Sequence, residues 1–100
     1  MVLTMQAIVD EINKYLAGFT NTKYSDWYVG IASSPQDRLF VDHSVSQDGN
    51  WVYAEAKSHF EARTVEQYFI DKLKTKGGPG GGDNTTKFVY AYLITNSTKE

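Results

Sequence analysis

The stretch Lys87-Phe-Val-Tyr-Ala-Tyr-Leu-Ile-Thr95 is the part of this chain that decides the fold. Its aromatic and β-branched residues are typical of a β-strand. Alternate residues of a strand point to opposite faces of the sheet, and here both sets are apolar. A strand that is apolar on both faces is usually covered on both sides. We therefore expect residues 87–95 to form the central strand of a sheet, although they come late in the chain.

Helices and two further strands are predicted around this centre. Apolar residues at helical spacing predict a helix within residues 1–19, with Thr4 as its N-cap. The other predicted elements are a strand at Trp27–Ala32, a short helix from Gln36 to about His43, a strand at Trp51–Ala56 and a helix from about Phe60 to Lys74. The Gly-rich run 77–83 is typical of a flexible connection. The order α-β-α-β-α-β predicts a small α+β (α/β) domain with a three-stranded sheet flanked by helices.

Length and composition exclude several classes of protein. A chain of 100 residues is expected to form a single domain, 1–100. Without cysteine it has no disulfide and no thiolate nucleophile. A net charge of −2 argues against a strongly basic nucleic-acid coat protein. No apolar run is long enough to span a membrane and no secretory signal is visible, so we expect a cytoplasmic protein without a membrane partner.

One residue breaks the apolar stripe of the long helix. Glu66 lies four residues from both Ala62 and Ile70, which places its carboxylate at or within the stripe. An ionised carboxylate there is costly unless it is paired or binds a cation. Two interpretations remain open: an ion pair with Arg63, or a metal ligand.

Four pieces of the chain, within residues 27–74, resemble the GIY-YIG nuclease superfamily. Tyr28-Val29-Gly30 is similar to the YIG half-motif, and Arg38 follows Gly30 by eight residues, the spacing usual in the family. His43 stands near the position of the family's next His. Ala62-Arg-Thr-Val-Glu66 is similar to the helix segment that ends in the family's metal-binding Glu.

The GIY half-motif, which precedes YIG in the family, has no counterpart upstream of Tyr28. The strand 87–95 is similar to the missing strand, displaced to the C-terminal side. The resemblance therefore implies a circular permutation, with the run 77–83 as the new connection and Tyr90 or Tyr92 in the place of the GIY tyrosine. It predicts that 87–95 pairs directly with Trp27–Ala32.

The resemblance also implies an activity, which is divalent-metal-dependent hydrolysis of nucleic-acid phosphodiesters, with DNA favoured over RNA. Glu66 would hold one weakly bound Mg²⁺ or Mn²⁺, and Arg38 would clamp the phosphate. Tyr28, with Tyr90 or Tyr92, would orient or deprotonate the attacking water, and His43 would relay the proton. The substrate would also contact Gly30, Lys72, Lys74 and Lys87.

Other interpretations remain open beside this one. The same fold without activity would serve as a nucleic-acid or protein binding module, and a small α/β protein unrelated to the family is a third possibility. Tyr28 would then be a half-buried strand tyrosine, and Arg38 would pair with Asp42 on its own helix. His43 and His59 lack metal-ligand spacing and would lie at the surface. The oligomeric state is left open.

Overall fold

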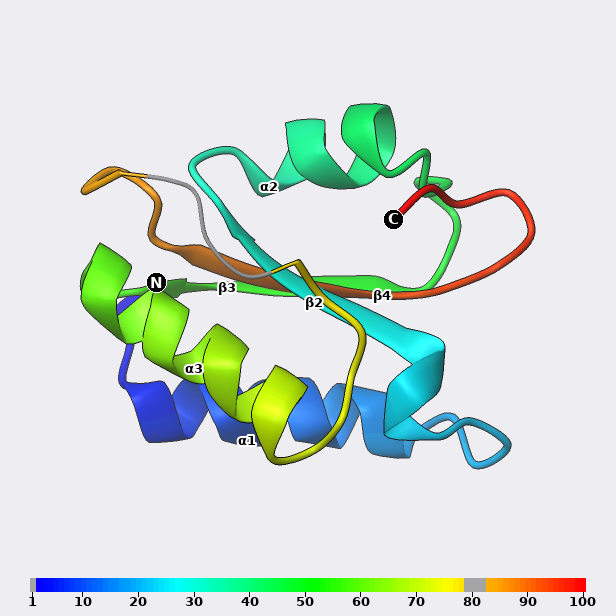
Figure 1. Cartoon of the computed structure of the whole chain (residues 1–100), viewed down its shortest axis with the longest axis horizontal. Coiled ribbons are helices and arrows are strands. Elements are labelled where there is room, and N and C mark those ends of the chain that lie inside the picture. Colours follow the sequence, from blue (N-terminus) through cyan, green and yellow to red (C-terminus); the bar gives the residue numbers. More distant parts are fainter. Residues whose placement is uncertain (1, 79–82) are drawn as a thin grey trace.

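The computed structural model describes residues 2–78 and 83–100. The chain forms an α+β domain with a four-stranded mixed sheet (Figure 1). Its elements, in chain order, are β1 (Val2–Leu3), α1 (Met5–Ala17), the 3₁₀ turn η1 (Tyr24–Asp26), β2 (Trp27–Ala32), α2 (Pro35–Asp37), the π-helical turn η2 (Arg38–Asp42), β3 (Trp51–Ala56), α3 (His59–Asp71) and β4 (Phe88–Leu93).

β4 lies inside the sheet, as the sequence predicts. The strand order is β1-β3-β4-β2, and β4 pairs antiparallel with both of its neighbours. The predicted pairing with β2 is confirmed in full register, from Trp27 opposite Leu93 to Ala32 opposite Phe88. The last long strand of the chain thus completes the sheet between two strands that precede it.

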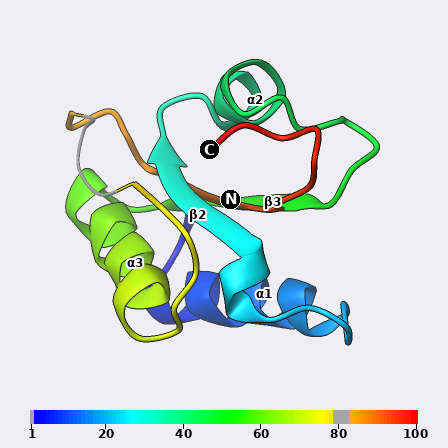
Figure 2. The same ribbon diagram turned by 45° about the vertical axis from the view of Figure 1, so that its right-hand side comes forward.

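The two faces of the sheet are covered by different elements. Figures 1 and 2 show α1 and α3 on one face, and α2 with the last residues of the chain on the other. Beneath α1 and α3 lies the main apolar core, which includes Ile8, Ile12, Trp27, Val29, Val65, Phe69, Val89 and Ala91. The opposite face carries a second cluster that includes Leu39, Val45, Tyr90 and Tyr92. We call these the helix-covered face and the tyrosine face.

The sheet has four strands rather than the three expected, because β1 joins it. Val2 and Leu3 pair in parallel with Glu55 and Ala56, and so add a fourth strand beside β3. The first helix is confirmed with Thr4 as its N-cap, because the Thr4 hydroxyl accepts the backbone N–H of Ala7. It spans Met5–Ala17 rather than all of residues 1–19. In the described residues no helix has the length and apolar character needed to cross a membrane.

The outer edge of β2 is partly covered by the segment Thr75–Gly78. Lys76 donates its backbone N–H to Trp27 and accepts from Val29, which makes a short parallel bridge. A Cβ at Gly77 would lie 2.5 Å from Ile70 Cδ1 and 2.7 Å from the Val29 carbonyl oxygen, so only glycine fits there. Of the Gly-rich connection expected at 77–83, residues 79–82 lie outside the described residues.

Candidate functional site

Three of the tyrosines on the tyrosine face, Tyr28, Tyr90 and Tyr92, meet in one cluster. Tyr28 of β2 lies directly opposite Tyr92 of β4, and Gly30 lies opposite Tyr90. The Tyr28 ring stacks at 5.3 Å from Tyr92 and 6.4 Å from Tyr90, measured between ring centroids. The shared face predicted for Tyr28 with Tyr90 or Tyr92 is confirmed, and both candidates belong to one cluster with Tyr28.

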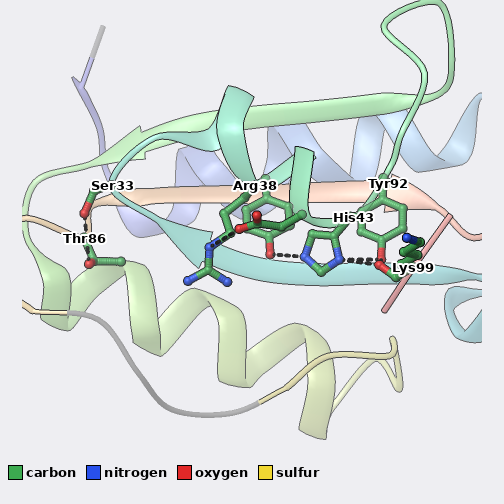
Figure 3. A network of polar contacts seen from close by, with 8 residues as sticks. Ser33, Arg38, His43, Thr86, Tyr92 and Lys99 are labelled. Atoms are coloured by element: carbon green, nitrogen blue, oxygen red, sulfur yellow. Dashed lines mark hydrogen bonds and ion pairs between the residues drawn. The ribbon is translucent and has the colours of Figure 1, made fainter. Parts of the chain in front are cut away.

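His43 joins this cluster from the end of η2. The wide π-turn, in which the His43 N–H bonds to the Arg38 carbonyl, carries the histidine down onto the sheet. Its Nε2 lies 2.7 Å from the Tyr90 hydroxyl, and its Nδ1 lies 2.6 Å from the Lys99 carbonyl oxygen. Figure 3 shows His43 beside Tyr92 and Lys99. The expectation of a surface histidine is wrong for His43, which is only 5% exposed.

Gly30 has a steric role in this cluster. A Cβ on Gly30 would lie 2.5 Å from the Tyr90 hydroxyl oxygen and 2.6 Å from the Tyr90 Cζ. The phenol therefore crosses directly over the glycine, which is buried. This contact accounts for the glycine of Tyr28-Val29-Gly30 by packing alone, without a contact to substrate.

The tyrosine hydroxyls of the cluster stay protonated over the physiological range. Burial raises the pKa of Tyr90 and of Tyr92, and the neighbouring Tyr28 raises both further. Burial also raises the pKa of Tyr28, against a hydrogen bond with the backbone of Gly78 that lowers it. Tyr90 and Tyr92 are at most 1% exposed, whereas Tyr28 is partly exposed. Tyr28 is thus the member of the three that meets solvent, and it does so as a neutral phenol.

Arg38 lies at the rim of the cluster and points outward. Its Nε is 3.4 Å from Asp42 Oδ2, and the two side chains are 50% and 57% exposed, so the expected ion pair is present but solvated. Arg38 also lines a surface pocket of about 300 Å³ at the end of β2. The other residues lining this pocket are Ala32, Ser33, Ser34, Asp37, Asp42, Asp83 and Thr86.

Glu66 is a buried acidic side chain beside the apolar core of the helix-covered face. It is 1% exposed, and its Oε1 has no hydrogen-bond partner among the described residues. Burial raises the pKa of the Glu66 carboxyl to about 7, and the positive charge of Arg63 offsets only part of that rise. The burial expected from the helix pattern is therefore confirmed, whereas Arg63 does not compensate the carboxylate in full.

The charges of Glu66 and Arg38 both act on Tyr28. The Glu66 carboxylate raises the pKa of that phenol beyond the effect of burial, and the Arg38 guanidinium lowers it. Both charges act on Tyr90 in the same senses. The unpartnered Oε1 of Glu66 could serve as the single protein ligand of a hard cation, because such cations prefer oxygen ligands. In the described residues no group of three or more His, Cys, Asp or Glu side chains is placed to hold a metal ion, so such a cation would need oxygens from the substrate and from water.

The lysines expected at the substrate come from two segments, one after α3 and one before β4. Lys72 and Lys74 follow the end of α3 and are exposed, and Lys74 adopts a left-handed backbone conformation with φ of 69°. The predicted helix to Lys74 thus ends at Asp71. Lys87 precedes β4, whose Phe88 pairs with Ala32, whereas Lys76 pairs with Tyr28. These points are four residues apart along β2, or roughly 13 Å in a strand.

Comparisons with protein-family models, with curated proteins and with solved structures gave no match for this chain. The resemblance to GIY-YIG nucleases therefore rests on the residues quoted above, and it stays a hypothesis.

The site contains one group that the sequence analysis missed, the backbone of Lys99. Its carbonyl oxygen accepts from the Tyr92 hydroxyl at 3.1 Å as well as meeting His43, and its N–H donates to the His43 carbonyl oxygen at 2.7 Å. A contact made by backbone atoms does not depend on residue type. No motif in the sequence would have revealed it.

Proposed function

We propose that this protein is a divalent-metal-dependent nuclease that hydrolyses phosphodiester bonds of nucleic acid, as the resemblance to GIY-YIG nucleases implies. One observation carries the proposal: Glu66 is buried with its Oε1 unpartnered among the described residues, and its charge and that of Arg38 both shift the pKa of the partly exposed Tyr28 phenol. A carboxylate can hold the divalent cation and a guanidinium can bind the phosphate oxygens, and the resemblance to GIY-YIG nucleases assigns the attacking water to the phenol.

The side chains would divide the work as follows. Arg38 is exposed and presents a planar guanidinium to phosphate oxygens, in exchange for its solvated pairing with Asp42. Tyr28 stays neutral, so its hydroxyl would orient the attacking water rather than deprotonate it. His43, Tyr90 and Tyr92 are buried behind Tyr28 and would hold its ring in place.

Glu66 would supply the single protein ligand for one Mg²⁺ or Mn²⁺. The bound cation would polarise the scissile phosphate and stabilise the leaving oxygen. Because Glu66 is half protonated near pH 7, a proton competes with the cation for the carboxylate. Cation binding is therefore expected to be weak and to strengthen from pH 6 to pH 8.

The test measures cleavage of labelled single-stranded, duplex and branched DNA, and of RNA, with Mg²⁺, with Mn²⁺ and with a chelator. We expect metal-dependent cleavage by the wild type and a loss of at least about 10²-fold in Glu66→Gln. The matched control is Glu11→Gln, which removes an exposed carboxylate from α1 and should leave the rate unchanged. Mn²⁺ should also broaden the NMR signals of residues around Glu66 in the wild type but not in Glu66→Gln. A wild type that shows neither cleavage nor broadening would contradict the proposal.

A binding module without activity is the second candidate. It is favoured by the burial of His43, Tyr90 and Tyr92, which keeps these side chains away from a bound nucleic acid. In that case the wild type and Glu66→Gln would bind the same nucleic acid with equal affinity, and cleavage would be absent with every metal. Fluorescence anisotropy at several salt concentrations separates the two candidates.

A further inference from the structure

The segment that follows β4 turns back over the tyrosine face and forms two hydrogen bonds with His43, one as donor and one as acceptor. The Lys99 N–H donates to the His43 carbonyl oxygen at 2.7 Å, and the Lys99 carbonyl oxygen lies 2.6 Å from His43 Nδ1. Figure 3 shows Lys99 against the His43 ring, beside Tyr92. The contact from Nδ1 to the Lys99 carbonyl oxygen is the shortest polar contact of His43 among the described residues.

The chemistry of these contacts determines which ring nitrogen carries the proton. A carbonyl oxygen only accepts, so Nδ1 at 2.6 Å must donate its hydrogen to Lys99. With the proton on Nδ1, the neutral ring leaves Nε2 as an acceptor for the Tyr90 hydroxyl at 2.7 Å. A doubly protonated ring would also donate from Nε2. The buried Tyr90 hydroxyl would then lack an acceptor among the described residues, which is costly.

Tyr92 bonds differently from Tyr90. Its hydroxyl donates to the Lys99 carbonyl oxygen at 3.1 Å, which uses the second lone pair of that oxygen. The Tyr92 oxygen lies 3.0 Å from His43 Nδ1 and shares that hydrogen with Lys99. Tyr92 therefore holds the carbonyl, whereas Tyr90 holds the far side of the imidazole ring.

The ring fixed in this way supports Tyr28. The His43 and Tyr28 ring centroids are 4.7 Å apart, closer than any other ring contact of Tyr28. We infer that the Lys99 backbone is a positioning group: it fixes His43 as the Nδ1–H tautomer, which engages Tyr90 through Nε2 and presents a rigid ring against which Tyr28 packs. The tautomer follows from the hydrogen-bond geometry alone, whereas its consequence for catalysis rests on the proposed function.

The experiment reads the tautomer directly, in the full-length chain at neutral pH. Two-bond ¹H–¹⁵N correlation spectra distinguish a protonated ring nitrogen from an unprotonated one, and His59→Asn assigns the His43 signals. In the wild type we expect hydrogen on Nδ1 and an unprotonated Nε2. Tyr90→Phe should shift the Nε2 signal and leave hydrogen on Nδ1. Tyr92→Phe should leave Nε2 unchanged.

Lys99→Pro removes the N–H that holds the segment to His43, and we expect it to produce a mixture of tautomers. Asn96→Pro is the matched control, because it places proline in the same segment without removing a bond to His43. In cleavage assays Lys99→Pro should lower kcat by about 10²-fold with KM nearly unchanged, as expected when a catalytic group is displaced.

Hydrogen on Nε2, or on both nitrogens, in the wild type would overturn the inference, as would an unchanged tautomer in a folded Lys99→Pro. If Lys99→Pro does not fold, the wild type, Tyr90→Phe and Tyr92→Phe still decide. The expected tautomer in a wild type that cleaves nothing would uphold the tautomer and reject the proposed function. Metal-dependent cleavage by a wild type with hydrogen on Nε2 would uphold the proposed function and reject the tautomer.

Discussion

The two faces of the sheet differ in how far a buried polar side chain is hydrogen-bonded. On the tyrosine face, His43 has a hydrogen-bond partner for each ring nitrogen, in Lys99 and in Tyr90. On the helix-covered face, Glu66 is buried at least as deeply, yet its Oε1 has no partner among the described residues. Full hydrogen bonding makes a buried polar group part of the fold, whereas an unsatisfied one costs free energy. Under the proposed function, this difference means that His43 would position the site and that Glu66 would supply the cation ligand.

The largest effect expected on stability comes from the apolar packing of the helix-covered face. Phe69→Ala removes a fully buried ring beneath α3 and should cost about 3–5 kcal/mol of the free energy of unfolding. Tyr92→Phe on the tyrosine face loses one hydroxyl while Lys99 still accepts from His43, and should cost about 1 kcal/mol. Urea denaturation of both variants measures the difference. Equal costs would mean that the polar network stabilises the sheet as much as the apolar core does.

Glu66→Gln should stabilise the protein, and the gain should depend on pH. The carboxyl has a pKa of about 7 in the folded state and about 4.3 in an unfolded chain. Below the unfolded pKa both states are protonated, and burial of Glu66 then costs little. As pH rises from about 4.3 to about 7 the unfolded state ionises first, so the wild type loses stability and Glu66→Gln does not. The variant should gain about 3 kcal/mol at pH 8 and almost nothing at pH 4.

Thermal melts from pH 4 to pH 8 check this expectation, with Glu11→Gln as the control that should show no such gain. Destabilisation by Glu66→Gln would contradict this expectation. If the ionised Glu66 compensates Arg63, its removal should destabilise the protein by about 3–5 kcal/mol, as for a broken buried pair. Glu66 would then be a structural residue, and the contrast between the two faces would disappear.

The features that could be predicted from the sequence are those written into local patterns. The central position of β4 follows from a strand that is apolar on both faces, and its pairing with β2 followed from the resemblance. The burial of Glu66 follows from its place in the apolar stripe of α3. β1 was missed because a strand of two residues, Val2 and Leu3, is too short to show any alternation.

The environment of His43 was missed for a different reason. Its partners Tyr90, Tyr92 and Lys99 lie about half the chain away, and they meet it only because η2 and the segment after β4 fold onto one face. The polar sequence around His43 indicates a surface position, and only the tertiary structure reverses that indication. The shared face of Tyr28 with Tyr90 and Tyr92 was therefore predictable, but the hydrogen bonds around His43 were not.

Gly30→Ala tests the packing of the tyrosine face, with an expected cost of about 1–3 kcal/mol. The new Cβ would lie 2.5 Å from the Tyr90 hydroxyl oxygen, so the ring must shift and the bond to His43 Nε2 must lengthen. Gly18→Ala in the C-cap of α1 is the control, since its Cβ would lie 3.3 Å from its nearest neighbour and φ is −69°. Chemical denaturation measures both. A neutral Gly30→Ala would show that the cluster adapts freely, and Gly30 would then need another explanation.

The smallest effect on stability is expected for Arg38→Lys, at no more than about 0.5 kcal/mol, because its pair with Asp42 is exposed and the charge is kept. The same change should lower the proposed cleavage rate by at least about 10²-fold, since lysine lacks the planar fork that meets two phosphate oxygens. Asp42→Asn provides the matched control: it breaks the same ion pair but leaves the guanidinium, so it should leave the rate unchanged or raise it. If both variants slow cleavage alike, the ion pair itself matters rather than the contact with phosphate. If neither variant does, Arg38 has no part in the site. A change of stability well above 0.5 kcal/mol would place Arg38 with His43, among the residues that maintain the tyrosine face, and not with Glu66.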